Sequence, residues 1–207
     1  MTLDEAIAAC PVVAILRGVL PDEVCGVGEA LFQAGVHAVE VPLNSPNPFV
    51  SIRRLVDRLG AHMACGAGTV LSAGDVSGAA QAGASFVVAP NTDGAVIRRA
   101  VALGLEPAPG FATASEAFQA IGAGARRLKL FPAASYGPHH LRQLTAVLPP
   151  DVEVWAVGGV GAADLAPWWA AGARAFGIGS EIYRSGQSVA ETSAKAAALV
   201  EAARALR

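Results

Sequence analysis

The sequence predicts an α/β fold, a (β/α)8 or TIM barrel, and three observations support this prediction. Short apolar runs alternate with alanine-rich stretches along all 207 residues. Several of these runs lack polar alternation, which is typical of parallel strands buried on both faces. Glycines follow the alanine-rich stretches at steps of about 20–25 residues, with one step of about twice that length. A period of this kind indicates a repeated strand–helix unit.

Eight apolar runs are the expected strands, and their number favours a closed barrel. A doubly wound open sheet is the alternative, but such a sheet usually has about five or six strands. The expected strands span Val12–Leu16, Ala38–Val41, Met63–Ala67, Phe86–Ala89, Leu105–Pro109, Leu128–Phe131, Val152–Val157 and Ala175–Ile178.

The intervening helices are expected to end at glycines, because glycine adopts the left-handed conformation beyond a helix without a steric penalty. These glycines are Gly35, Gly60, Gly83, Gly104, Gly124 and Gly172. A short helix over Thr2–Ala9 is expected to cap the floor of the barrel, and Ser188–Arg207 is the expected last helix. With no linker between the repeats, residues 1–207 are predicted to form a single domain.

Composition excludes several classes of protein. The chain is 53% hydrophobic and 15% charged, unlike a disordered chain. Its apolar runs fall short of the roughly 20 residues of a membrane helix. A net charge of −2 offers no basic surface for nucleic acid. Acidic residues near the start of the sequence do not fit a secretory signal, which carries basic residues there. Three cysteines without a CxxC pair are expected to be reduced thiols in a cytoplasmic protein.

Lys129 is the most informative residue at a strand end, where the reacting groups of such barrels lie. Of 15 basic residues, only Lys129 and Lys195 are lysine. A strand lysine is ordinarily a snorkelling side chain or half of an ion pair, but arginine would serve either role. Lysine differs because a buried amine can lose its proton and attack a carbonyl. The composition therefore favours a Schiff-base lysine, activated further if a cation such as Arg17 is near.

Glu40 is the acid that lies inside a strand end. It has a structural interpretation, an ion pair with Arg17, and a functional one, a general acid and base beside an imine. The two interpretations are compatible.

Two glycine-containing turns follow the seventh and eighth strands. Gly158-Gly159 and Gly179-Ser180 lie where barrels of this kind often bind phosphate through backbone N–H groups. Histidine and aspartate are absent from the strand ends, so no metal site is predicted.

A set of motifs then indicates a family. In chain order they are Ile15–Gly18, Val39–Pro46, Gly66–Val70, Val88–Asn91, Leu128–Pro132, Val157–Val160 and Gly177–Ser180. Together they resemble the class I 2-keto-3-deoxy-6-phosphosugar-acid aldolases, and the similarity covers nearly the whole chain.

The resemblance implies a role for each matching residue. Lys129 would form the Schiff base, and Glu40 would be the acid and base. Arg17 and Thr69 would contact the carboxylate region of the keto acid, with Pro90 and Phe131 at neighbouring strand ends. Gly158, Gly159, Gly179 and Ser180 would hold the phosphate. The family is typically a homotrimer and needs no metal or cofactor, so the expected partner is a small phosphorylated keto acid.

The family acts on two substrates that differ in configuration at C4. The gluconate type usually has Thr-Leu-Arg after the glutamate and Thr-Gly-Gly on the seventh strand. This chain has Pro42-Leu43-Asn44 and Val157-Gly158-Gly159 instead. It therefore resembles the galactonate type, and Asn44 and Val157 are the candidates for discriminating between the epimers.

The expected reaction is aldol cleavage of the phosphorylated galactonate derivative to pyruvate and D-glyceraldehyde 3-phosphate. The gluconate epimer and 4-hydroxy-2-oxoglutarate are alternative substrates. Outside the class, a sugar-phosphate-binding barrel or an epimerase is the alternative function.

Overall fold

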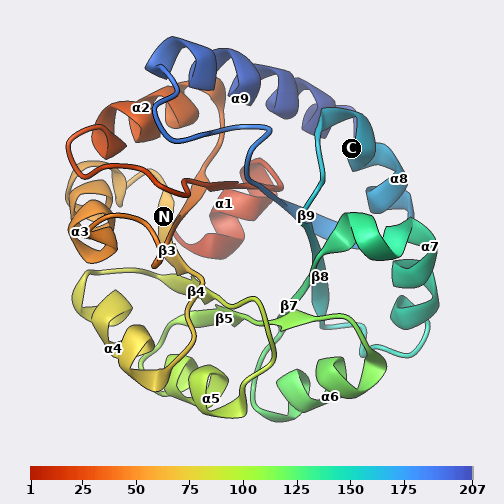
Figure 1. The fold of residues 1–207 in the computed structure, drawn as a ribbon. Helices are drawn as coiled ribbons and strands as arrows, with labels where there is room; N and C mark the ends of the chain where they lie inside the picture. Colours follow the sequence, from red (N-terminus) through yellow and green to blue (C-terminus); the bar gives the residue numbers. More distant parts are fainter. Residues whose placement is uncertain (207) are drawn as a thin grey trace.

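The computed structural model describes residues 1–206, in which a nine-stranded parallel sheet curls into a nearly closed barrel with helices around it (Figure 1). Arg207, the last residue of the predicted domain and final helix, lies outside the described residues. The strands are β1 (Val12–Ile15), β2 (Ala38–Pro42), β3 (Ala64–Gly68), β4 (Phe86–Val88), β5 (Glu106–Ala108), β6 (Gly110–Phe111), β7 (Arg127–Leu130), β8 (Glu153–Val157) and β9 (Ala173–Ile178).

The nine strands occupy eight positions because the expected fifth strand is divided at Pro109. The sheet order is β5-β4-β3-β2-β1-β9-β8-β7-β6, so its two ends, β5 and β6, flank this proline. Proline has no backbone N–H to donate to a neighbouring strand, which favours an interruption here. Its carbonyl still accepts a 2.8 Å hydrogen bond from the Lys129 backbone N–H. The predicted barrel is confirmed, with the fifth strand corrected to two short pieces.

A helix follows each strand except β5, and these helices lie on the outside of the barrel (Figure 1). They are α2 (Val24–Ala34), α3 (Pro48–Leu59), α4 (Ala73–Gln81), α5 (Gly94–Ala102), α6 (Ala114–Gly122), α7 (Ala133–Thr145), α8 (Leu165–Ala170) and α9 (Val189–Arg204), with a 3₁₀ turn, η1, at Ala162–Asp164. Within residues 1–206, no helix is long and apolar enough to cross a membrane.

Five of the six glycines expected at helix ends have a positive φ, between 72° at Gly104 and 112° at Gly172. This conformation turns the chain from a helix towards the next strand. Gly60 is the exception, since its φ is −59° and the helical conformation continues through it. Helix α3 thus ends just before Gly60 as predicted, but the left-handed conformation expected there is wrong.

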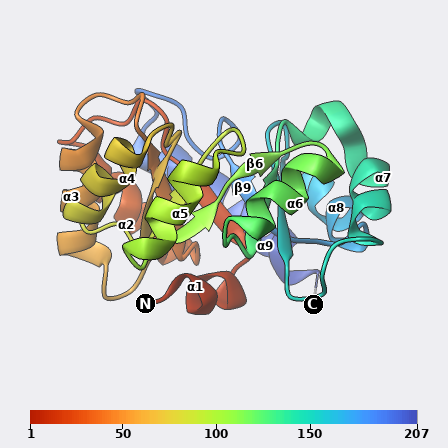
Figure 2. The ribbon, with the colours of Figure 1, turned by 90° about the horizontal axis from the view of Figure 1, so that it is seen from below.

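Helix α1 (Leu3–Ala9) lies across the lower end of the barrel, as the sequence predicts (Figure 2). Thr2 and Glu5 form a capping box at its start. Leu3, Ala6 and Ile7 pack into the apolar interior of the barrel, together with side chains from the strands. The apolar interior thus lies between α1 below and the carboxyl ends of the strands above.

Aromatic rings fill the middle of the barrel. Phe86 and Trp155 are fully buried, with ring centroids 6.4 Å apart and planes at 75°. A Cβ at Gly66 would lie 2.5 Å from the Phe86 ring, so glycine is required on β3 for this ring to occupy the interior. The interior above α1 is therefore packed with side chains and not open as a channel.

A charge cluster lies at the floor, where Arg127 begins β7. Its side chain is only 10% exposed and forms ion pairs with Asp4 of α1, Glu106 of β5 and Glu153 of β8. The Arg127–Glu106 distance is 2.9 Å and the Arg127–Glu153 distance is 3.2 Å. One buried cation therefore connects α1 to two strands and separates three carboxylates.

Replacing Arg127 by methionine should lower the free energy of unfolding by about 2–4 kcal/mol, because three carboxylates would lose their shared cation. Arg126→Met is the matched control. Arg126 pairs with Asp151 at 3.2 Å, but both side chains are more than half exposed, so we expect a loss of at most about 1 kcal/mol. Urea unfolding of both variants measures the difference, and equal losses would contradict a structural role for the floor cluster.

Candidate active site

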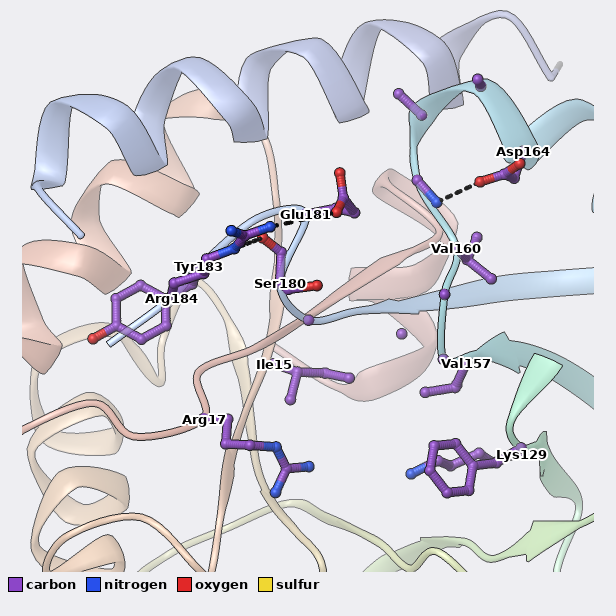
Figure 3. A pocket seen from close by; sticks show the side chains of 18 residues that line it. Ile15, Arg17, Lys129, Val157, Val160, Asp164, Ser180, Glu181, Tyr183 and Arg184 are labelled. Atoms are coloured by element: carbon purple, nitrogen blue, oxygen red, sulfur yellow. Dashed lines mark hydrogen bonds and ion pairs between the residues drawn. The ribbon is translucent and has the colours of Figure 1, made fainter. Parts of the chain in front are cut away.

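A cavity of about 820 Å³ opens at the carboxyl ends of the strands (Figure 3). Eight of the predicted site residues line it, and they come from the ends of β1, β7, β8 and β9. They are Arg17, Lys129, Phe131, Val157, Gly158, Gly159, Gly179 and Ser180. The barrel therefore brings together residues that lie far apart in the sequence.

Lys129 lies on the inner wall of the barrel. The strand register places it between Gly110 of β6 and Trp155 of β8. Only 6% of its surface is exposed, and its Nζ lies 4.6 Å from the centroid of the Phe131 ring. Burial lowers the pKa of the Lys129 amine, the nearby Arg17 charge lowers it further, and Glu40 acts in the opposite direction. The side chain therefore releases its proton more readily than an exposed lysine.

Glu40 lies on the inner face of β2 and is 3% exposed. A Cβ at Gly68 of β3 would clash with its carboxylate, so the glycine provides the space that this group occupies. Its Oε2 is buried and has no hydrogen-bond partner among the described residues. Burial raises the pKa of Glu40, while the Lys129 and Arg17 charges lower it to a smaller extent.

Arg17 follows β1 at the mouth of the barrel, and its side chain extends across the cavity towards Lys129 (Figure 3). Its Nη1 donates a 2.6 Å hydrogen bond to Asn44 Oδ1. The loops after β1 and β2 are also joined by a 3.0 Å hydrogen bond from the Gly18 N–H to Ser45 Oγ. Asn44 therefore contacts Arg17 and is not part of the cavity lining.

Two backbone segments form the opposite end of the cavity. After β8, Gly158 and Gly159 both have positive φ, 98° and 72°. The chain then enters η1, where Asp164 Oδ2 accepts a 2.8 Å hydrogen bond from the Gly161 N–H. After β9, Gly179 and Ser180 lie across the cavity from this segment. Small residues on both sides leave room for a ligand to approach the backbone.

Four of the predicted site residues lie outside the lining of this cavity: Asn44, Thr69, Pro90 and Glu40. Thr69 follows β3 with a φ of 54°, and Pro90 follows β4; neither lines the cavity, and nor does Glu40. Val157 and Phe131 do line it.

Sequence reasoning missed several lining residues. These are Ile15, Val160–Asp164, Gly177, Glu181, Tyr183 and Arg184. The predicted residues lie at the strand ends, whereas the loops after β8 and β9 continue along the cavity for several residues more. The segment after Gly158 and Gly159 could have been predicted as part of the site, because phosphate sites in barrels often include a short helical turn at this position.

The arrangement combines three chemical features. A buried amine with a lowered pKa can add to a carbonyl. A buried carboxyl group with a raised pKa keeps a proton more readily than an exposed one and can exchange it with a bound molecule. Glycine-containing backbone segments can accommodate an anion. Among residues 1–206, no group of three histidine, cysteine, aspartate or glutamate side chains is arranged to hold a metal ion.

Comparison with known proteins agrees with this chemistry. The family model described as "Aldolase: KDPG and KHG aldolase" matches residues 3–199. The chain is 49% identical to 2-dehydro-3-deoxy-6-phosphogalactonate aldolase of Escherichia coli, over 94% of this chain and 95% of that protein. It is 36% identical to 2-dehydro-3-deoxy-phosphogluconate aldolase of Pseudomonas aeruginosa, over 82% and 75%.

A solved structure described as "Native KDPGal structure" superimposes with a TM-score of 0.93 at 48% identity, covering 95% of both chains. Fold, sequence and family model thus agree over nearly the whole length. The chain belongs to the KDPG and KHG aldolase family of class I aldolases.

Proposed function

We propose that this protein cleaves 2-dehydro-3-deoxy-6-phosphogalactonate to pyruvate and D-glyceraldehyde 3-phosphate through a Schiff base on Lys129. The observation that carries the proposal is the position of the Lys129 amine. It is buried at the inner wall of the cavity, with its pKa lowered, and glycine-containing segments suited to phosphate form the opposite end. The identity to the Escherichia coli enzyme supports the choice of substrate.

The reaction begins when the neutral Lys129 amine attacks the C2 ketone. Loss of water gives an iminium ion, whose positive nitrogen accepts electrons from the C3–C4 bond. Arg17 lies beside this centre, where its guanidinium can hold the C1 carboxylate of the keto acid, and Asn44 orients it. Thr69, in the loop after β3, is proposed to assist there.

Glu40 is proposed to act as the base for cleavage. It takes the proton of the C4 hydroxyl as the C3–C4 bond breaks, which releases glyceraldehyde 3-phosphate and leaves an enamine on Lys129. Protonation of the enamine at C3 and hydrolysis of the imine then release pyruvate and restore the amine. The raised pKa of Glu40 suits it for both accepting and returning a proton.

The phosphate is proposed to bind at Gly158, Gly159, Gly179 and Ser180. This holds the substrate at both ends and positions C2 for attack. Phe131 and Val157 line the cavity on the Lys129 side, and Pro90 follows the neighbouring β4 strand.

Val157 is proposed to select the epimer together with Asn44. Its side chain is buried and apolar at the cavity wall. A threonine there would offer a hydroxyl to one configuration at C4, and valine removes that hydrogen bond. Asn44 acts through its contact with Arg17.

We also propose a homotrimer that works in the cytoplasm. The family resemblance supports the trimer. Among the described residues Cys10, Cys25 and Cys65 form no disulfide, and Cys10 and Cys65 are buried, which supports a reducing compartment.

Pyruvate with sodium borohydride should attach irreversibly to Lys129, because reduction of the imine fixes the adduct. Peptide mass spectrometry locates it, and Lys195, on α9 and paired with Glu191 at 2.9 Å, is the internal control. Lys129→Arg should abolish both the adduct and cleavage. An adduct on Lys195 alone, or full activity of Lys129→Arg, would contradict the proposal.

Gly68→Ala should lower kcat by about 100-fold, because the new Cβ displaces the Glu40 carboxylate and small misplacements of a catalytic group have effects of this size. Gly122→Ala on α6 is the matched control, since a Cβ there meets nothing within 4 Å. Steady-state rates at saturating substrate measure the effect. A Gly68→Ala enzyme with unchanged kcat would argue against a role for Glu40.

Val157→Thr should shift the ratio of kcat/KM for the two C4 epimers towards the gluconate form by about tenfold, the usual size of one hydrogen bond. Val160→Thr, the same change elsewhere in the cavity lining, should leave the ratio unchanged. Parallel assays with both epimers test this. If the wild-type enzyme prefers the gluconate form, the substrate assignment is wrong while the reaction class stands.

A further inference from the structure

Arg184 lies in the loop after β9, at the end of the cavity where phosphate is proposed to bind. The backbone N–H groups of Ile182 and Tyr183 both donate to the Gly179 carbonyl, at 2.9 and 3.0 Å. This turn brings Arg184 back over Ser180, whose carbonyl accepts a 3.2 Å hydrogen bond from Arg184 Nε. Figure 3 shows the guanidinium beside Ser180 and Glu181.

The charges at this end of the cavity are mainly negative. Asp164 and Glu181 line this end of the cavity, and Arg184 is the basic residue that lines it with them. Lys129 and Arg17, the other cations of the lining, lie at the opposite end (Figure 3). A phosphate monoester carries about −1.5 to −2 charges near pH 7. Backbone N–H groups donate hydrogen bonds to phosphate but add no net positive charge, so a nearby cation would stabilise the bound dianion.

The two carboxylates are engaged differently. Asp164 accepts the hydrogen bond of the Gly161 N–H and belongs to the local fold. Glu181 Oε1 lies 3.9 Å from Arg184 Nη2, in an exposed and loose ion pair with side chains 57% and 67% exposed. A pair of this kind contributes little stability, and its partners can separate at little cost.

We propose that Arg184 binds the substrate phosphate and that Glu181 competes with the phosphate for the same guanidinium. Arginine pairs with phosphate through two parallel hydrogen bonds, which are stronger than the loose contact to Glu181. Glu181 thereby limits how tightly the phosphate is held. The inference rests on the proposed function for the identity of the substrate, while the anion site itself can be tested separately.

The two residues should have opposite effects on phosphate binding. Arg184→Ala should raise the Kd of inorganic phosphate, measured by calorimetry, and the KM of the phosphorylated keto acid, each about tenfold. Arg184→Lys should restore part of the loss, because it returns the charge without the paired hydrogen bonds. Glu181→Gln should lower both constants about threefold, since the competing charge is removed.

A matched pair on α9 provides the control. Arg204 and Glu201 form an exposed ion pair at 3.6 Å with the same three-residue spacing. Arg204→Ala and Glu201→Gln change the net charge equally, and they should leave both constants unchanged. Pyruvate lacks a phosphate, so its trapping by borohydride should be equal in wild type and Arg184→Ala; a change there would indicate a general structural defect.

A Kd of phosphate and a KM of the keto acid that are unchanged in Arg184→Ala would overturn the proposal. Weaker phosphate binding in Glu181→Gln would also overturn it, because Glu181 would then hold Arg184 in its binding position and not compete with the phosphate. The phosphate measurement does not require turnover. If pyruvate is not trapped on Lys129 but Arg184→Ala weakens phosphate binding, the proposed function fails and the phosphate role of Arg184 stands.

Discussion

The burial of two ionisable groups, Lys129 and Glu40, in one apolar barrel interior is the constraint on which the site depends. Burial disfavours the charged form of each, so it lowers the pKa of the amine and raises that of the carboxyl group. Each group also opposes the shift of the other, because their opposite charges attract. The balance suits Lys129 and Glu40, in the same barrel interior, to their proposed roles as nucleophile and proton carrier, without a metal ion being needed for the proposed steps.

The packing of the barrel produces this environment. Gly66 and Gly68 on β3 leave space for the Phe86 ring and the Glu40 carboxylate. Phe86 and Trp155 then fill the middle of the barrel. Small residues on one strand thus allow large or charged side chains from its neighbours to occupy the centre, which an interior lined uniformly by valine or leucine would not permit.

Arg127 and Lys129 show that the position of a basic residue along a strand determines whether its side chain forms ion pairs. Both belong to β7 and are two residues apart, so their side chains face the same interior. Arg127 lies at the floor and forms ion pairs with three carboxylates. Lys129 lies at the mouth, and among residues 1–206 it forms no ion pair within 4.0 Å. The ion-pair role that a basic residue in a strand ordinarily has therefore belongs to Arg127 and not to Lys129.

Local patterns predicted much of the fold and of the site. Apolar runs located the strands to within about two residues, and the scarcity of lysine drew attention to Lys129. Features that depend on distant contacts were not predicted. Asp4 and Glu106 meet Arg127 only when the barrel forms, and the space for Glu40 depends on Gly68 of the neighbouring strand. Arg184 reaches the cavity because its loop turns back at Gly179, a path that periodicity does not show.

The most direct test of this account is the titration of the Lys129 amine by NMR. With ¹³Cε-labelled lysine, a Lys195→Arg variant leaves Lys129 as the single lysine signal. We predict a pKa below that of an exposed lysine, because burial is the largest influence on this group. Glu40→Gln should lower the pKa further, since the Glu40 charge favours the protonated amine. A pKa equal to or above that of an exposed lysine, or one that rises in Glu40→Gln, would contradict the account.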